Sequence, residues 1–284
     1  MSIVSQICRR IGRTILLLGL VSLGTIALMR LAPGYFADAR EMDAKYGSNA
    51  RSELAQEQTQ HGSLSGIASE VFVGWAHGSF GRSRQFDVPV SELLLPRLRV
   101  SASLLLQGLA YGWLFAICAA LPLSAARGAS WFGAPFTVLL AIPTAAMATL
   151  CLLADTGGPV LVLTLLLAAR DFKFLHRLLR SAWKSPHLLQ GRAQGLRVDQ
   201  LVRNHLIPDV LPQIFALASL SLITALSAIV PVEVIFNVPG VGQLAWTAAM
   251  NRDLPVLLTV TLVMAVAVTC AGVFSTPVRS META

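Results

Sequence analysis

The stretch FNVPGVGQL, residues 236–244, interrupts the apolar C-terminal third of this chain. It places one Asn, one Pro and two Gly between two apolar runs, at about 210–236 and 254–274. Pro removes a backbone donor, and inside lipid every freed backbone group needs a partner. The break therefore predicts a helix end that lines a pathway or packs on protein. An ordinary surface turn between two membrane spans is the alternative.

Composition indicates a membrane protein that crosses the bilayer several times. The chain has 284 residues, of which 55% are hydrophobic and only 13% charged, and its mean hydropathy is +0.65. Soluble domains carry about 25% charged residues. We predict an all-α, polytopic integral membrane protein with about six transmembrane helices. The predicted spans are 11–31, 100–126, 131–153, 159–169, 210–236 and 254–274. For the first of these, a cleaved signal peptide is the rival interpretation.

The basic residues are distributed asymmetrically between the predicted spans. Segment 170–209 carries eight bases against three acids, whereas segment 32–99 carries seven bases against eight acids. Because cytoplasmic loops are enriched in Lys and Arg, we expect both termini in the cytoplasm. The predicted organisation is a cytoplasmic N-terminus with the first helix (1–31), an extracytoplasmic loop (32–99) and a five-helix core (100–279). Membrane topology also explains the formal charge of +7, so no nucleic-acid partner is expected.

Motifs for catalysis, nucleotide binding and metal binding are missing from the sequence. There is no GxxxxGK[ST] stretch, no GxSxG, no CxxC and no HExxH, so we expect no enzyme activity, cofactor or metal. Only Glu233 lies deep in a predicted span, which is thin support for an ion-coupled transporter. A transporter without a visible energy source needs a partner. Residues 185–208 predict a helix–turn–helix broken at Gly195 and suited to docking, and a solvated basic linker is the alternative.

Three stretches resemble the inner-membrane permease subunits of ATP-binding-cassette importers, in the oligopeptide, dipeptide and nickel branch. They are LMRLAPG (28–34), GSFGRSRQFDVPVSELLLPRLRVSASLLL (78–106) and VEVIFNVPGVGQLAWTAAMNRDLPVL (232–257). The resemblance implies the type I importer permease fold in a bacterial inner membrane. It also implies a second permease subunit, cytoplasmic ATPases and an extracytoplasmic solute-binding protein as partners. The implied solutes are peptides or related small molecules.

The resemblance also places an ATPase-coupling motif on the cytoplasmic segment 170–209. Gly195 takes the position of the motif glycine, and His205, Ile207 and Pro208 take its closing positions. Gly191 stands where the family has alanine, and we expect it to weaken the first coupling helix by up to roughly 1 kcal/mol. The predicted coupling residues are Leu189, Gln190, Gly191, Arg192, Ala193, Gln194, Gly195, Leu196, His205 and Pro208.

The opening stretch resembles a gate in the same family. We expect Pro239 and Gly240 to end the preceding helix at 236–237, and Gly242 to let the chain turn back. Glu233 can accept hydrogen bonds from the freed amides or lie at the headgroup level. The predicted gate residues are Glu233, Asn237, Pro239, Gly240 and Gly242. An ion-coupled secondary transporter and a degenerate permease acting as a scaffold stay open as alternatives.

Overall fold

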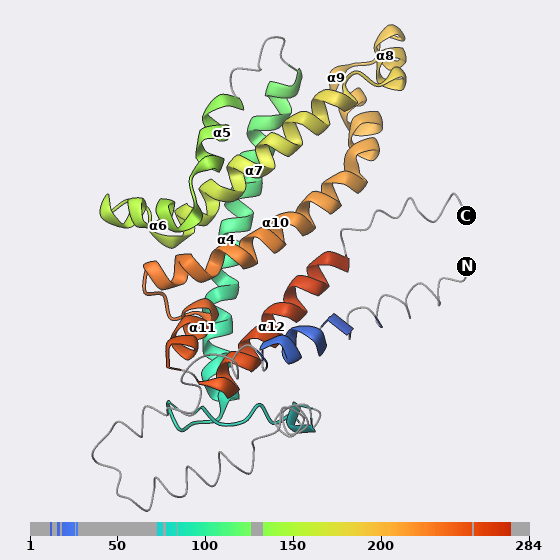
Figure 1. Cartoon of the computed structure of the whole chain (residues 1–284). Coiled ribbons are helices and arrows are strands. Elements are labelled where there is room, and N and C mark those ends of the chain that lie inside the picture. The colour runs from blue at the N-terminus through green and yellow to red at the C-terminus, as the bar shows by residue number, and fades with distance from the viewer. Residues whose placement is uncertain are drawn as a thin grey trace, which may run out of the picture. The chain divides into compact units, whose positions relative to one another are not determined.

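The computed structural model describes residues 78–83, 85–125, 133–251 and 253–273, together with parts of 12–27 and residues 73–75. These residues are almost entirely helical and contain no strand beyond one isolated bridge between Arg82 and Pro89 (Figure 1). The all-α prediction is therefore confirmed. The elements are α4 (Val90–Ala125), α5 (Gly133–Ala141), α6 (Thr144–Leu153), α7 (Gly158–Ala182), α8 (Pro186–Ala193), α9 (Val198–Leu201), the π-helix η3 (Val202–Leu206), α10 (Ile207–Ile235), α11 (Val241–Met250) and α12 (Leu254–Val273).

Three helical stretches of the described chain are long and apolar enough to cross a membrane. They are Val90–Ser124, Val198–Ile235 and Leu254–Gly272, and they match the second, fifth and sixth predicted spans. The third predicted span is broken: α5 and α6 meet at an angle of 96°, next to Pro143. The fourth is continuous with its basic tail in the single helix α7. Within the first, 11–31, the described residues are 12, 16, 17, 19–25 and 27, and all of them are helical.

Helix α4 begins earlier than hydropathy indicates. Its first residue is Val90, inside the segment that we predicted as loop up to residue 99. Polar and charged residues in its first turns, such as Glu92 and Arg97, conceal the helix from a hydropathy criterion. Val90 and Leu94 are nevertheless buried, so packing of one helix face holds this part of α4 in place.

The described chain forms two compact units. Unit 1 combines the residues up to Leu98 with Gln243–Val266, and unit 2 combines Arg99–Gly242 with the residues from Ala267. Unit 2 contains α5 to α10 and most of α4. Within it, α7 and α10 lie side by side and contact each other (Figure 1).

Two glycines allow α4 to approach α7 closely. A Cβ on Gly108 would lie 2.8 Å from Cβ of Leu163, and a Cβ on Gly112 would lie 2.9 Å from Cβ of Leu167. Real Cβ atoms essentially never come this close, so both positions require glycine at the observed spacing. Small residues at helix interfaces are typical of membrane bundles, where close backbone packing replaces the hydrophobic effect.

Candidate functional site

The end of α10 coincides with the break that the sequence predicted. The helix ends at Ile235, and Asn237 adopts a positive φ of 51°. Asn tolerates this left-handed conformation better than most residues do. The turn therefore depends on Asn237, and our expectation for Gly242 was wrong: Gly242 already belongs to α11.

A buried carboxylate joins three segments of unit 2 at this junction. Glu233, near the end of α10, is 0% exposed. Its Oε1 accepts a hydrogen bond from the Ser101 hydroxyl of α4 at 2.5 Å, and its Oε2 accepts one from the Gly242 amide at 2.6 Å. The Val241 amide donates to Ser101 Oγ at 2.7 Å. We call Glu233, Ser101, Val241 and Gly242 the carboxylate clasp.

The clasp satisfies the first two amides of α11. The N-terminal amides of a helix have no partner within the helix, and the helix dipole favours a negative group beside them. A carboxylate and a hydroxyl supply the missing acceptors here, in a buried site where unpaired donors would be costly. The clasp therefore fixes the start of α11 against the end of α10 and against Ser101 within α4.

Gly240 and Gly242 are needed because a side chain at either position would clash with its neighbours, and neither has a positive φ. A Cβ on Gly240 would overlap the Glu233 carboxylate. A Cβ on Gly242 would lie 2.7 Å from Cα of Val230 and 3.0 Å from Glu233 Oε2. Both glycines thus let the chain pass directly over the carboxylate that holds it. The predicted gate residues Glu233, Gly240 and Gly242 meet at one point, and Asn237 and Pro239 lie in the connecting turn.

The predicted coupling segment forms a small helical hairpin at the opposite end of α10. It consists of α8, a turn at Gly195, α9 and η3, and it leads directly into α10. Gly195 has a φ of 77°, a conformation that L side chains rarely adopt. The Arg197 amide donates to Gln200 Oε1 at 3.2 Å, which closes the first turn of α9. We call residues 186–206 the hairpin.

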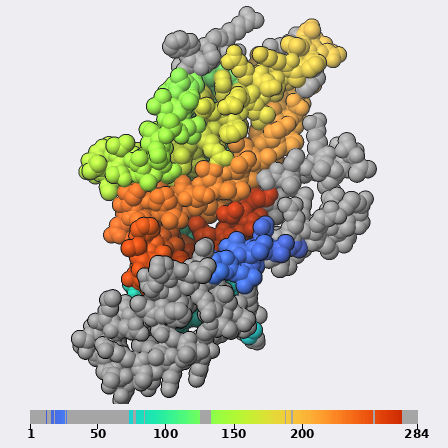
Figure 2. Space-filling model, in the orientation of Figure 1, coloured from blue at the N-terminus to red at the C-terminus, as the bar shows by residue number. Residues whose placement is uncertain are grey.

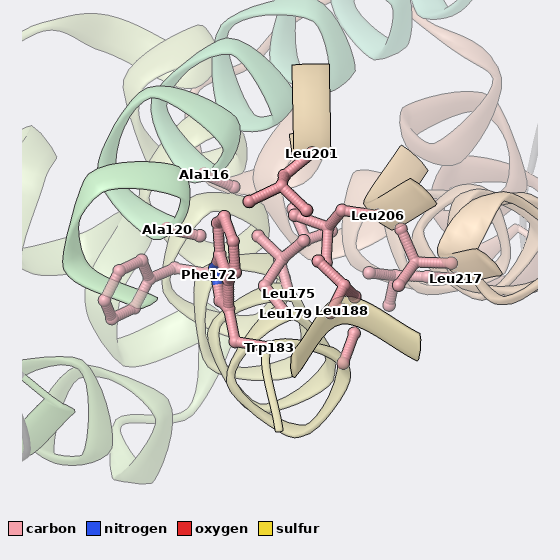
Figure 3. Close-up of a cluster of buried hydrophobic side chains, with 12 residues drawn as sticks. Ala116, Ala120, Phe172, Leu175, Leu179, Trp183, Leu188, Leu201, Leu206 and Leu217 are labelled. Atoms are coloured by element: carbon pink, nitrogen blue, oxygen red, sulfur yellow. The ribbon is translucent and has the colours of Figure 1, made fainter. Parts of the chain in front are cut away.

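The inner face of the hairpin is buried against the long helices of unit 2. Leu188, Leu201 and Leu206 are at most 1% exposed. Figure 3 shows these three side chains meeting Leu175 and Leu179 of α7. The cluster also includes Ala116 and Ala120 of α4, Phe172, Ala182, Trp183, and Val210 and Leu217 of α10. Because close-packed interiors transmit strain, we expect a displacement of the hairpin to reach α7 and α10.

The outer face of the hairpin exposes apolar side chains together with small polar ones. Leu189 is 52% exposed and Val198 is 66% exposed. Among the other predicted coupling residues, Gln190, Ala193, Gln194, Gly195 and Pro208 are exposed, and Leu196 and His205 are half-buried. Only the backbone of Arg192 is described. Most of the predicted coupling residues are therefore accessible in the structure.

The effect of Gly191 on the hairpin differs from our expectation, which considered only helix propensity. Gly191 is buried, and a Cβ there would lie 2.7 Å from Leu201 Cδ2 and 3.4 Å from Leu196 Cδ1. The absent methyl group leaves room for Leu201 to enter the gap between α8 and α9. The predicted loss of helix propensity is thus opposed by closer packing within the hairpin.

Three residues of this architecture were not among the predicted sites. Ser101 completes the carboxylate clasp. In unit 1, the Ser83 hydroxyl donates to the buried Asp253 carboxylate, which also accepts from the Gln85 amide at 3.3 Å. All three missed residues lie within the stretches 78–106 and 232–257 that carry the family resemblance. Each is a polar residue inside a stretch that resembles the family, and this was the signal that could have found them.

Comparison with known proteins gives this architecture a family. Residues 108–278, more than half of the chain, match the model of the binding-protein-dependent transport system inner membrane component. The chain belongs to this family. It is therefore a permease subunit, a multi-pass inner-membrane component of a transport system and not an enzyme. The family works with a solute-binding protein, a partner ATPase and a second permease.

Individual relatives match over most of their length. The chain is 25% identical to a probable peptide ABC transporter permease protein of Sinorhizobium fredii, over 89% of this chain and 90% of that protein. It is 24% identical to a dipeptide transport system permease protein of Lactococcus lactis, over 93% of this chain and 92% of that protein. A solved structure of the inward-facing MetNI methionine ABC transporter has a TM-score of 0.51 at 19% identity. That match covers 62% of this chain and 90% of the other, and it establishes the importer permease fold.

Proposed function

We propose that this permease takes up peptides or related small solutes. Its relatives in Sinorhizobium fredii and Lactococcus lactis are named for peptide and dipeptide transport, and both align over nearly the whole chain. We further propose that it pairs with a different permease subunit, so that two membrane components enclose one pathway.

The hairpin is the proposed docking site for the ATPase, and its two-sided character is the observation that carries the proposal. Its inner face is fully buried against α7 and α10, while Leu189 and Val198 are exposed on its outer face. An ATPase that grips the outer face would therefore move α7 and α10 together. Helix α10 has 29 residues and is about 43 Å long, which is enough to carry this motion across a bilayer.

The carboxylate clasp is the proposed outer gate. It lies at the end of α10 farthest from the hairpin, and Glu233, Gly240 and Gly242 meet there within hydrogen-bonding or van der Waals contact. A rocking motion of α10 would shift the clasp and the start of α11 as one piece. In this proposal the hairpin and both chain termini are cytoplasmic, in keeping with the eight bases of segment 170–209.

The assembly is tested by affinity purification from gently solubilised membranes, followed by mass spectrometry. We expect a second permease and an ATPase to accompany the chain. Recovery of the chain alone would favour an ion-coupled transporter, which would take up solute with a proton or sodium gradient and no ATP. Recovery of the full assembly without ATP-dependent peptide uptake would favour a scaffold.

Two adjacent leucines give a matched test of the docking surface. Leu189→Ala changes the exposed outer face, and we expect it to reduce ATPase recovery while thermal unfolding stays unchanged. Leu188→Ala removes a fully buried side chain, and such a change costs about 2–5 kcal/mol of stability. If Leu189→Ala leaves ATPase recovery and uptake at wild-type levels, the hairpin is not the docking site.

A further inference from the structure

Helix α7 changes from apolar to basic half-way along its length. Residues 158–169 contain no charged side chain, whereas residues 170–182 contain four basic side chains and one acidic one. The change comes at the start of the segment that the proposed function places in the cytoplasm. Since membrane proteins concentrate Lys and Arg at the cytoplasmic ends of their spans, we expect the second half of α7 to lie at the level of the lipid headgroups.

The basic residues of α7 lie along one face of the helix. Spacings of three or four residues keep side chains on the same side of a helix. The bases follow this spacing from Arg170 through Lys173, Arg177 and Arg180 to Lys184, which lies in the turn after α7. All five are exposed or half-buried, and we call them the basic stripe. Figure 2 shows α7 reaching the surface between α5 and α10.

Neighbouring helices hold only the first two members of the stripe. Arg170 Nη1 donates to the Leu220 carbonyl of α10 at 3.1 Å, and Lys173 Nζ donates to the Thr137 hydroxyl of α5 at 3.0 Å. In the part of the chain that the structure describes, the other three members form neither a hydrogen bond nor an ion pair. Guanidinium and ammonium groups carry five and three N–H donors, so the stripe offers many donors to a ligand.

Nearby carboxylates do not neutralise the stripe. The charge of Asp171 interacts with the adjacent Arg170, but the Asp171 side chain is fully buried and accepts a hydrogen bond from Ser221 of α10 at 2.6 Å. The cytoplasmic segment as a whole carries eight bases against three acids, Asp199 and Asp209 included, which leaves an excess of five positive charges. Such an excess favours an anionic partner.

An exposed aromatic ring lies within the stripe. Phe174 is 48% exposed, and Cζ of Arg170 and Cζ of Arg177 lie 6.0 Å and 5.9 Å from its ring centroid. Basic residues beside exposed Phe or Leu are typical of helices at a membrane surface, where the ring contacts acyl chains and the cations contact headgroups. The ring therefore favours a phospholipid over a soluble anion as the occupant of the stripe.

We propose that the basic stripe binds the phosphate groups of anionic phospholipids in the cytoplasmic leaflet, while Phe174 contacts their acyl chains. This inference rests on the cytoplasmic orientation in the proposed function. Guanidinium groups bind phosphate oxygens through two parallel hydrogen bonds, and basic clusters beside an apolar span recognise anionic headgroups. Because α7 packs against the hairpin through Leu175 and Leu179, a bound lipid would also hold the helix that supports the proposed docking site.

The test measures how tightly the complete importer, purified in mild detergent, binds phosphatidylglycerol labelled on an acyl chain. Arg177→Gln combined with Lys184→Gln removes two exposed charges of the stripe. Each base near an anionic surface strengthens binding roughly fivefold, so we expect the affinity for phosphatidylglycerol to fall about 25-fold. Binding of equally labelled phosphatidylcholine should be weak in the wild type and unchanged in the variant. Arg177→Lys combined with Lys184→Arg keeps both charges and should retain most of the affinity.

The matched control is Arg197→Gln combined with Arg203→Gln. It removes two exposed charges from the same cytoplasmic segment but outside the stripe, and it should leave the affinity unchanged. An equal fall in both double variants would mean that net charge, and not the stripe, attracts the lipid. Equal wild-type affinity for phosphatidylcholine would overturn the proposal. Displacement of the lipid by an equal concentration of inorganic phosphate would assign the stripe to a soluble anion, and loss of the second permease from the stripe variant would assign it to that subunit.

A separate measurement tests the orientation on which the inference rests. Ser181 is exposed on the same face of α7. In a chain whose four native cysteines are replaced by serine, Ser181→Cys should react with a membrane-impermeant maleimide only from the cytoplasmic side. Reaction only from the opposite side would overturn the proposed orientation, and with it the cytoplasmic leaflet as the source of the lipid. Labelling from the cytoplasm without a preference for phosphatidylglycerol would overturn the lipid site alone.

Discussion

Replacing Gly242 by alanine tests the packing of the carboxylate clasp directly. In an ordinary helix position this change stabilises by up to about 1 kcal/mol, because alanine has the higher helix propensity. Here the new Cβ would lie 2.7 Å from Cα of Val230, a backbone atom that cannot rotate away. The start of α11 must therefore move outward by several tenths of an ångström or more.

That movement stretches the hydrogen bond between the Gly242 amide and Glu233 Oε2, which is 2.6 Å long. Losing a buried bond to a charged group costs about 1.5–3 kcal/mol. Overpacking adds about 1–3 kcal/mol. Against a propensity gain of about 1 kcal/mol, we expect a net loss of about 1.5–5 kcal/mol.

The measurement is thermal unfolding in mild detergent, followed by circular dichroism. Gly272→Ala is the matched control, because Gly272 lies in α12 with no atom within 4 Å of its added Cβ. We expect the control to unfold at or slightly above the wild-type temperature and Gly242→Ala to unfold well below it. If both variants unfold together, the close passage of α11 over Glu233 is wrong.

Three further tests, two of them with a comparison variant, address other parts of the structure. Gly195→Ala should destabilise the hairpin by about 1–2 kcal/mol, because a φ of 77° strains any L side chain, and it should reduce ATPase recovery. Gly158→Ala, with a φ of 65°, should cost as much stability and leave ATPase recovery intact; equal recovery for both would refute the coupling role. Gly112→Ala should cost about 1–3 kcal/mol by forcing α4 from α7, and an unchanged melting temperature would count against this packing. Ser83→Ala should cost about 1–3 kcal/mol in unit 1, since it deprives the buried Asp253 carboxylate of its hydroxyl donor, and Ser83→Thr should restore part of the loss.

Much of the fold could be predicted because its signals are local. Long apolar runs correspond to α4, α10 and α12, and the break at 236–244 corresponds to the turn between α10 and α11. The hairpin with its turn at Gly195 was also predictable from spacing and a single glycine. The predicted start of the second span was too late, because packing of one helix face lets α4 begin at Val90 despite its polar residues. The third predicted span is divided into α5 and α6 next to Pro143.

The candidate sites were predictable only in part. Glu233 was identifiable as the lone acidic residue deep in a predicted span, and its possible bonds to freed amides were part of that interpretation. Its partner Ser101 was not identifiable, since 132 residues separate the two in sequence. Gly191 was judged from helix propensity, whereas its contact with Leu201 depends on how α8 and α9 pack.

The sequence by itself determined that this chain is a helical membrane permease and where most of its helices break, and it predicted a short helical hairpin outside the spans. Hydropathy and backbone preferences determine these properties over a few residues at a time. Only the tertiary structure decided that Gly240 and Gly242 cover the Glu233 carboxylate, and that the missing side chain of Gly191 leaves room for Leu201 between α8 and α9. Those facts depend on contacts between helices, and such contacts exist only once the helices are packed.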